Sequence, residues 1–412
     1  MLNHRIYKFI CCVVALLGVT TQHHLNAQKA LKPIRIYLQQ NKPAQALAEI
    51  QRLSTDEKTA VLPKLYDYGV EANIQLYNSY NEKMYLKQAS DTAAFFKATY
   101  DIFVFALKCD SLEQINIDNG QKAQFRKKNN LLLHEYYSNL RAGSWYFFRH
   151  KDYKTAACFA LLVHNAPFAP LWGENQEEVQ TQTYNGNASI GVLSLYQLSR
   201  YDEIGPLVES ALSDTGRLRE SVVQALALVA ESKSDSAQTL QYLQLGLQDH
   251  PNSPFFFDKL ANYYQQKQDY VALRTLAEDM LQRDSLDARF LATETFALIC
   301  LDENERAIEF GKELLRVDSA NVMGPYYLGV AYCNMASKIE LPTNINNRRY
   351  KTLKAQKQNF YRAARPYLEA YKELRPKDSS DWAPLLYRVY LELNEGRKFE
   401  EMARILSSPT TP

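Results

Sequence analysis

Glycine is scarce in this sequence. It accounts for 14 of the 412 residues, about half of the ~7% that is usual in soluble proteins. Glycine supplies the left-handed turns of β-hairpins and the close backbone approach of phosphate-binding loops, so the shortage disfavours folds built on those features. The sequence also lacks GxxxxGK(S/T), GxGxxG, GxSxG and HExxH motifs. The composition therefore favours a helical protein without a recognisable catalytic centre.

Long apolar runs are missing as well. The longest, Phe9–Val19, has about 11 residues, whereas a helix that spans a bilayer needs about 20. It follows the basic residues Arg5 and Lys8 and precedes a small-residue segment at 25–27, an order typical of a cleaved secretory signal. We therefore predict a signal peptide over residues 1–27. The mature protein would be extracytoplasmic, either periplasmic or secreted, and would have no transmembrane segment.

The mature chain would also lack net charge and a dense set of cysteines. Removal of residues 1–27 takes away two basic and no acidic residues, which leaves 46 of each sign. Without a long-range field, neither nucleic acid nor an anionic membrane is expected as the main partner. The remaining cysteines are too few for a disulfide-dependent scaffold, and we expect mostly buried thiols: Cys109, Cys158, Cys300 and Cys333. Only Cys300 and Cys333 stand at similar places in successive repeats, where stacking would bring them near each other.

What the sequence does contain is an internal repeat. Each unit has two segments with apolar residues at helical spacing, joined by a polar turn. In the unit from Pro254 these positions are Phe257, Leu260, Ala261 and Tyr264, then Asp269-Tyr270 at the turn, then Leu273, Ala277 and Met280. Regular 34-residue units begin at Glu220, Pro254, Ala288 and Val322, and looser units begin near Tyr137 and Asn185.

This pattern of large, small and apolar positions resembles the tetratricopeptide repeat, a helix–turn–helix unit of 34 residues. Small residues such as Ala261 and Ala277 stand where paired helices must approach closely. The resemblance implies an all-α solenoid of helical hairpins that stack into a right-handed superhelix, as in exported bacterial proteins of this family. Glu294 departs from the pattern, because the family has leucine there.

The expected organisation is one continuous array without a linker. After the signal peptide (1–27), it comprises divergent helical hairpins over 28–136, two looser units with an intervening loop over 137–219, regular units over 220–376, and a capping helix pair with a tail over 377–412. An insertion at about 336–359 interrupts the last regular unit. The polar composition of 111–128 and 170–187 predicts loops there.

The resemblance implies that the first helices of the units line a concave groove. The residues that the register places on this face are Arg141, Trp145, Phe148, Arg149, Tyr196, Asp258, Asn262, Gln265 and Tyr326. For each of them, a structural role competes with a binding role. We predict a non-catalytic scaffold that binds a protein or peptide partner there, without a cofactor or metal. Two alternatives remain open: an accessory protein that binds glycans or cell surfaces, and a hydrolase with an unrecognised site.

The groove is not expected to hold a C-terminal carboxylate. Family members that grip this group repeat Lys and Asn at matching first-helix positions, since a terminal anion needs several converging donors. Here the fifth positions of the units are Arg141, Ser189, Gln224, Asp258, Ala292 and Tyr326. Asp258 would repel an anion, whereas Trp145 offers an apolar anchor. The sequence therefore predicts that Trp145→Ala weakens partner binding more than Asp258→Ala does.

Positive charge is concentrated in the interrupted unit. Residues 346–366 carry seven cations and no acid. We consider two interpretations: a solvated extension of a long second helix, and a contact with an anionic partner (an acidic protein, a lipid headgroup or a polysaccharide) through Arg348, Arg349, Lys351 and Lys354.

The signal peptide predicts the N-terminus of the exported chain. Intact-mass analysis of protein from its native host should give a chain that begins at Gln28 or within a few residues of it. A chain that retains Met1 would contradict export.

Overall fold

The computed structural model describes residues 29–120, 122–174 and 181–407. The predicted signal peptide and its cleavage site lie outside this part of the chain. Within it the protein is all-α, without a β-strand. It divides into two compact units, unit 1 (Met1–Tyr242) and unit 2 (Leu243–Pro412), a division that the sequence did not predict. No helix of the described part is long and apolar enough to cross a membrane.

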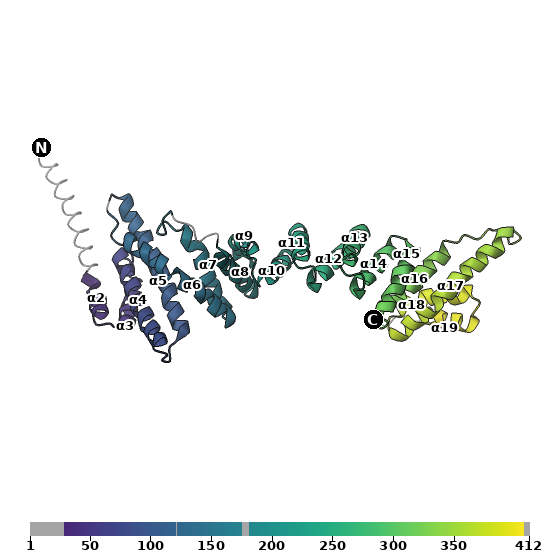
Figure 1. Cartoon of the computed structure of the whole chain (residues 1–412), viewed down its shortest axis with the longest axis horizontal. Helices are drawn as coiled ribbons and strands as arrows, with labels where there is room; N and C mark the ends of the chain where they lie inside the picture. Colours follow the sequence, from purple (N-terminus) through teal and green to yellow (C-terminus); the bar gives the residue numbers. More distant parts are fainter. Residues whose placement is uncertain (1–28, 121, 175–180, 408–412) are drawn as a thin grey trace, which may run out of the picture. The chain divides into compact units, whose positions relative to one another are not determined.

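Unit 1 is a series of helical hairpins (Figure 1). Its α-helices are α2 (Lys32–Gln39), α3 (Pro43–Leu53), α4 (Pro63–Tyr85), α5 (Thr92–Asp118), α6 (Arg126–Arg149), α7 (Tyr153–Asn165), α8 (Gln182–Gln197), α9 (Val208–Leu212) and α10 (Arg219–Ser232). Consecutive helices pack against each other along most of this series. Their core gathers large aromatic side chains such as Phe103, Tyr137 and Phe159.

Unit 2 continues with regular hairpins and a cap. After α11 (Ser236–Asp249), which contains the boundary between the units, come α12 (Pro254–Gln266), α13 (Tyr270–Leu281), α14 (Ala288–Cys300), α15 (Asn304–Val317), α16 (Met323–Ser337), α17 (Arg348–Leu374), α18 (Ser379–Glu392) and α19 (Gly396–Ser407). First helices begin at Arg219, Pro254, Ala288 and Met323, each at or next to the start expected from the sequence.

The 34-residue period is also present in the backbone. The turns inside successive hairpins pass through Ser234, Gln268 and Asp302, whose φ angles are 58°, 54° and 63°. This left-handed conformation closes the preceding helix, and the N–H of Asp269 donates to the carbonyl of Tyr264 at 2.9 Å. The Asp269 carboxylate then caps α13 by accepting from the backbone N–H of Ala272 at 3.0 Å. The fold is thus an all-α solenoid of tetratricopeptide type.

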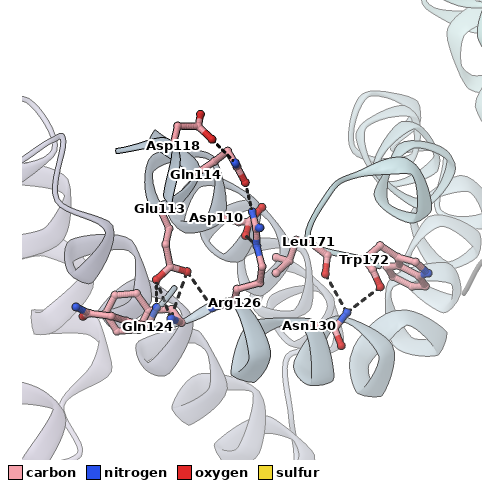
Figure 2. A network of polar contacts seen from close by, with 10 residues as sticks. Asp110, Glu113, Gln114, Asp118, Gln124, Arg126, Asn130, Leu171 and Trp172 are labelled. Atoms are coloured by element: carbon pink, nitrogen blue, oxygen red, sulfur yellow. Dashed lines mark hydrogen bonds and ion pairs between the residues drawn. The ribbon is translucent and has the colours of Figure 1, made fainter. Parts of the chain in front are cut away.

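The looser units of unit 1 depart from the predicted loops. The segment 111–118 is helical, because α5 continues to Asp118. Its polar side chains hold the start of α6: the Glu113 carboxylate accepts from the backbone N–H groups of Phe125 and Arg126 at 2.9 and 3.0 Å (Figure 2). Arg126 in turn donates to Asp110 and Gln114, each at 2.6 Å. Of the predicted loop 111–128, only the described residues 119–120 and 122–125 are non-helical, and the polar side chains before them belong to α5 and hold the start of α6.

Two further parts of the looser units differ from expectation. The predicted loop 170–187 is shorter, since α8 already begins at Gln182. In the looser unit that begins near Asn185, the second helical segment is broken into two 3₁₀ turns and the short α9. Pro206 interrupts it, because proline has no N–H to donate to the preceding turn.

The cysteines agree only in part with the expectation of buried thiols. All four described cysteines are free, Cys300 is exposed and Cys158 is half-buried, so only Cys109 and Cys333 are the buried thiols expected. There is thus no disulfide between Cys300 and Cys333.

The insertion forms a link at 338–347 and the first turns of α17. This is the extended second helix that we considered as one interpretation of the basic segment.

Paired helices approach each other closely at glycines. A Cβ atom on Gly143 of α6 would overlap the Phe159 ring of α7, and Phe159 is fully buried. We predict that Gly143→Ala lowers the free energy of unfolding by about 1–3 kcal/mol, since the packed ring has no space to move into. Chemical denaturation measures this. Gly186→Ala in α8 is the control, because a Cβ there would meet no atom within 4 Å apart from its chain neighbours and the backbone of its own helix. The control should be neutral or stabilise by about 0.5–1 kcal/mol, and equal stabilities would contradict the close approach.

Candidate functional site

The candidate site is a pocket of about 320 Å³ in unit 2. Three first helices, α12, α14 and α16, contribute nearly all of its wall, and α13 contributes one side chain. The lining residues are Phe257, Asp258, Ala261, Asn262, Gln265, Leu273, Arg289, Ala292, Thr293, Phe296 and Tyr327. The pocket therefore lies on the face that the first helices form together, called here the first-helix face.

One helix supplies the polar wall of the pocket. Asp258, Asn262 and Gln265 stand at i, i+4 and i+7 of α12, so they share one side of the helix. All three are exposed, and their side chains make no hydrogen bond or ion pair to any described residue. Ala261, between them, leaves room for a ligand to approach the helix. These three residues are the members of the predicted set that the structure brings together.

Aromatic rings form the opposite wall. The ring centroids of Phe296 and Tyr327 lie 6.0 Å apart, and Phe296 also contacts Tyr270 at 6.1 Å. Both Phe296 and Tyr327 are half-buried. Burial raises the pKa of Tyr327 to about 12, so its hydroxyl is neutral at physiological pH and able to donate a hydrogen bond.

The one cation of the pocket already has a partner. Arg289 donates to the Asp287 carboxylate with N–O distances of 3.2 and 2.7 Å. Burial favours a higher pKa for Asp287, but the hydrogen bonds from Arg289 outweigh it and the pKa is lowered. Asp287 therefore stays ionised and keeps the guanidinium neutralised. The Asp258 charge also acts on Arg289 without forming an ion pair, so the pocket suits a neutral or basic ligand better than an anion.

The other predicted site residues lie elsewhere. In unit 1, the ring of Trp145 is half-buried, and the guanidinium of Arg217 covers it at 5.1 Å. Phe148 packs against Trp145 and the core. Arg141 lies over the Tyr137 ring at 4.9 Å. These contacts give the three side chains a structural role.

Arg149, Tyr196 and Tyr326 also stand apart from the pocket. Arg149 is exposed at the C-terminal end of α6. Tyr196 packs on Tyr201 with ring centroids 6.1 Å apart, and Tyr326 packs on Tyr371 at 4.9 Å. Sequence reasoning missed Arg289, Phe296 and Tyr327, although the repeat register places Tyr327 only one residue after the predicted Tyr326.

A buried carboxylate lies on α14 next to the pocket wall. Glu294 follows the lining residue Thr293, is fully buried, and neither of its oxygens accepts a hydrogen bond from a described residue. Its nearest cation is Arg306, whose Nη2 lies 3.6 Å from Oε1. Arg306 is shared with Glu278 at 3.0 Å and with Glu303 at 2.8 Å. Burial, aided by Glu278, therefore raises the pKa of Glu294 to about 7, against the opposing effect of Arg306 and Arg274.

Comparison with known proteins gives likenesses of fold. No family model matches the chain, and no curated protein does. Among solved structures, it is similar to the C-terminal part of a TPR repeat-containing protein from Cytophaga hutchinsonii, with 13% identity, 66% of this chain and 96% of that chain covered, and a TM-score of 0.41. It is also similar to the TPR domain of P58(IPK), with 12% identity, 90% and 99% covered, and a TM-score of 0.26.

The repeated helix geometry, and not these likenesses, carries the assignment of the fold. A solenoid of tetratricopeptide type is in general a protein-interaction scaffold.

Within the described residues, no cluster of three or more His, Cys, Asp or Glu side chains is placed to hold a metal ion.

The buried Glu294 predicts a pH dependence of stability. Its pKa is higher in the folded state, about 7, than its ordinary value of 4.5. Between these values the folded protein holds a proton that the unfolded chain releases, so its contribution to stability falls as pH rises from about 4.5 to 7. Glutamine cannot lose a proton, so Glu294→Gln should not show this loss. We predict that the unfolding free energy of Glu294→Gln minus that of the unsubstituted protein is about 1–3 kcal/mol larger at pH 8 than at pH 5. Denaturant titrations at the two pH values measure this.

The control is Glu309→Gln on α15, because Glu309 is exposed. It should leave the difference between pH 5 and pH 8 unchanged. If Glu294→Gln behaves like this control, Glu294 is ionised in the folded state at both pH values.

Proposed function

We propose that the protein is an exported, non-catalytic scaffold that binds a segment of a protein partner in the unit 2 pocket. The observation that carries the proposal is the set of three uncommitted polar side chains, Asp258, Asn262 and Gln265, along one side of α12. A tetratricopeptide-type solenoid interacts with proteins in general. Binding at the first-helix face and export to the periplasm or beyond are the proposed additions.

The chemistry of the pocket supports a peptide segment. The amides of Asn262 and Gln265 each offer a donor and an acceptor, which is what the N–H and C=O groups of an extended main chain require. The aromatic wall of Phe296 and Tyr327 takes apolar or basic side chains. A volume of about 320 Å³ is at the lower end of the range for ligand pockets, so it holds a few side chains and not a folded domain.

The same features weigh against the other classes. A glycan-binding site stacks sugar on an open ring face, whereas Phe296 and Tyr327 are half-buried and pack on each other. A glycoside hydrolase needs a pair of carboxylates across the bond that it cleaves, and Asp258 is the only lining carboxylate. A C-terminal carboxylate would meet Asp258 and a neutralised Arg289, so an internal segment of the partner fits better.

The experiment is a comparison of pocket variants against peptides selected from a display library on the mature protein. Asn262→Ala and Gln265→Ala should each weaken binding by about 5–30-fold, the effect of losing one or two hydrogen bonds. Fluorescence anisotropy measures the affinity. Gln266→Ala is the matched control, because Gln266 is an exposed residue of α12 that does not line the pocket. Equal effects of Gln265→Ala and Gln266→Ala would contradict the site.

Two further variants compare the pocket residue Asp258 with Trp145, the apolar anchor predicted from the sequence. From the sequence, we expected Trp145→Ala to weaken partner binding more than Asp258→Ala. The pocket predicts the reverse order for peptides that contain a basic residue. Amidation of the peptide's C-terminus should leave the affinity unchanged. An affinity that vanishes on amidation would refute the binding of an internal segment.

A further inference from the structure

The first turns of α17 carry four cations without ion-pair partners. They are exposed, and none forms an ion pair with a described residue: Arg348, Arg349, Lys351 and Lys354. Of the later cations of the same helix, Arg362 is also exposed and among the described residues bonds only to Asn359, whereas three others pair with acids of α18, of α19 and of the turn between them. Lys357 contacts Glu392 at 3.6 Å, Arg365 pairs with Glu395, and Lys372 contacts Glu401 at 2.8 Å. Figure 1 shows the start of α17 projecting past α18 and α19, the helices that, together with the turn between them, carry the acidic partners of its later cations.

This arrangement costs folding free energy. The N-terminus of a helix carries a positive partial charge, so cations in the first turn are unfavourable there. The first turn of α17 contains no acidic residue. Arg348 and Lys351, and then Lys351 and Lys354, also stand three residues apart, where like charges repel each other. A charge pattern that opposes local stability is typical of a functional surface.

An exposed apolar residue precedes the cations. Ile345, in the link before α17, has 66% of its surface exposed, and Asn347 caps the helix by accepting from the N–H of Arg349 at 2.9 Å. Tyr350 and Leu353, by contrast, are half-buried. We call Ile345 and the four cations the basic tip.

We propose that the basic tip docks on the surface of a lipid bilayer that contains anionic headgroups. The cations attract the headgroups, and Ile345 enters the interface just beneath them. Each Lys or Arg close to such a surface contributes about fivefold to partitioning. Four of them therefore give reversible attachment and not irreversible anchoring. The proposal is independent of the pocket, because no residue of the basic tip lines it.

The distribution of the cations favours a bilayer over an acidic protein. At 100° per residue, the four side chains are spread over roughly 220° of the helix circumference. A partner helix or strand would face only one stripe of that circumference. A plane of headgroups that meets the projecting end of the helix contacts the whole ring of cations at once. The apolar side chain also stands at this end, where it reaches the plane first.

The test is co-sedimentation of the mature protein with vesicles of phosphatidylglycerol and phosphatidylcholine in equal parts. We expect binding that weakens between 0.1 and 0.5 M NaCl, because salt screens the attraction, and little binding to phosphatidylcholine alone. Replacement of Arg348, Arg349, Lys351 and Lys354 by Gln should reduce partitioning by about a hundredfold or more. Ile345→Ser should reduce it by about tenfold.

The matched control removes the same charge elsewhere in unit 2. Arg283, Lys377, Arg388 and Arg397 are exposed and make no ion pair with a described residue, and their joint replacement by Gln should change partitioning less than threefold. Circular dichroism checks that each variant is folded. Equal losses in the two quadruple variants, or no binding to the anionic vesicles, would overturn the proposal. So would equally tight binding to polyglutamate or dextran sulfate that does not depend on Ile345, since the tip would then recognise a soluble polyanion.

Discussion

The close approach of neighbouring helices at small residues is the constraint on which the rest of the structure depends. Gly311 of α15 shows how it acts in unit 2. A Cβ at this position would lie 2.9 Å from Leu328 of α16 and 3.4 Å from Thr295 of α14. The bare glycine thus lets α14 and α16, two successive first helices, settle against the same second helix. Since both helices line the pocket, the spacing of its walls is set by a contact behind it.

This dependence explains which parts of the site were accessible to sequence reasoning. Asp258, Asn262 and Gln265 share a side of one helix, and that requires only the helical period, which the sequence contains. The opposite wall of Arg289, Phe296 and Tyr327 requires the stacking of three hairpins. Register predicts that stacking approximately, and an error of one residue moved the prediction from Tyr327 to Tyr326, which faces Tyr371 instead.

Unit 1 shows the limits of local reasoning more strongly. Trp145 occupies a position that the register places on the first-helix face, yet Arg217 covers its ring from more than seventy residues away in the sequence. Likewise, the loop predicted over 111–128 begins only after Asp118, because 111–118 continue α5, from which Glu113 and Asp110 hold the start of α6. In both cases tertiary packing outside the repeat pattern sets the partner of the side chain, and neither period nor composition identifies it. The regular hairpins were predictable because their partners lie about one repeat away.

Charge in unit 2 is arranged by the same geometry. Where helices pack side by side, acids and bases alternate across them, as Arg274, Glu278, Glu303 and Arg306 do around the buried Glu294. Where α17 runs past its neighbours, its first four cations form no ion pair with an acid in the part of the chain that the structure describes. The pocket, in contrast, holds an uncommitted carboxylate and a neutralised guanidinium. A basic or neutral segment in the pocket and an anionic surface at the basic tip therefore make opposite electrostatic demands. Because the two proposed surfaces call for ligands of opposite charge and share no residue, their ligands would not compete for the same side chains.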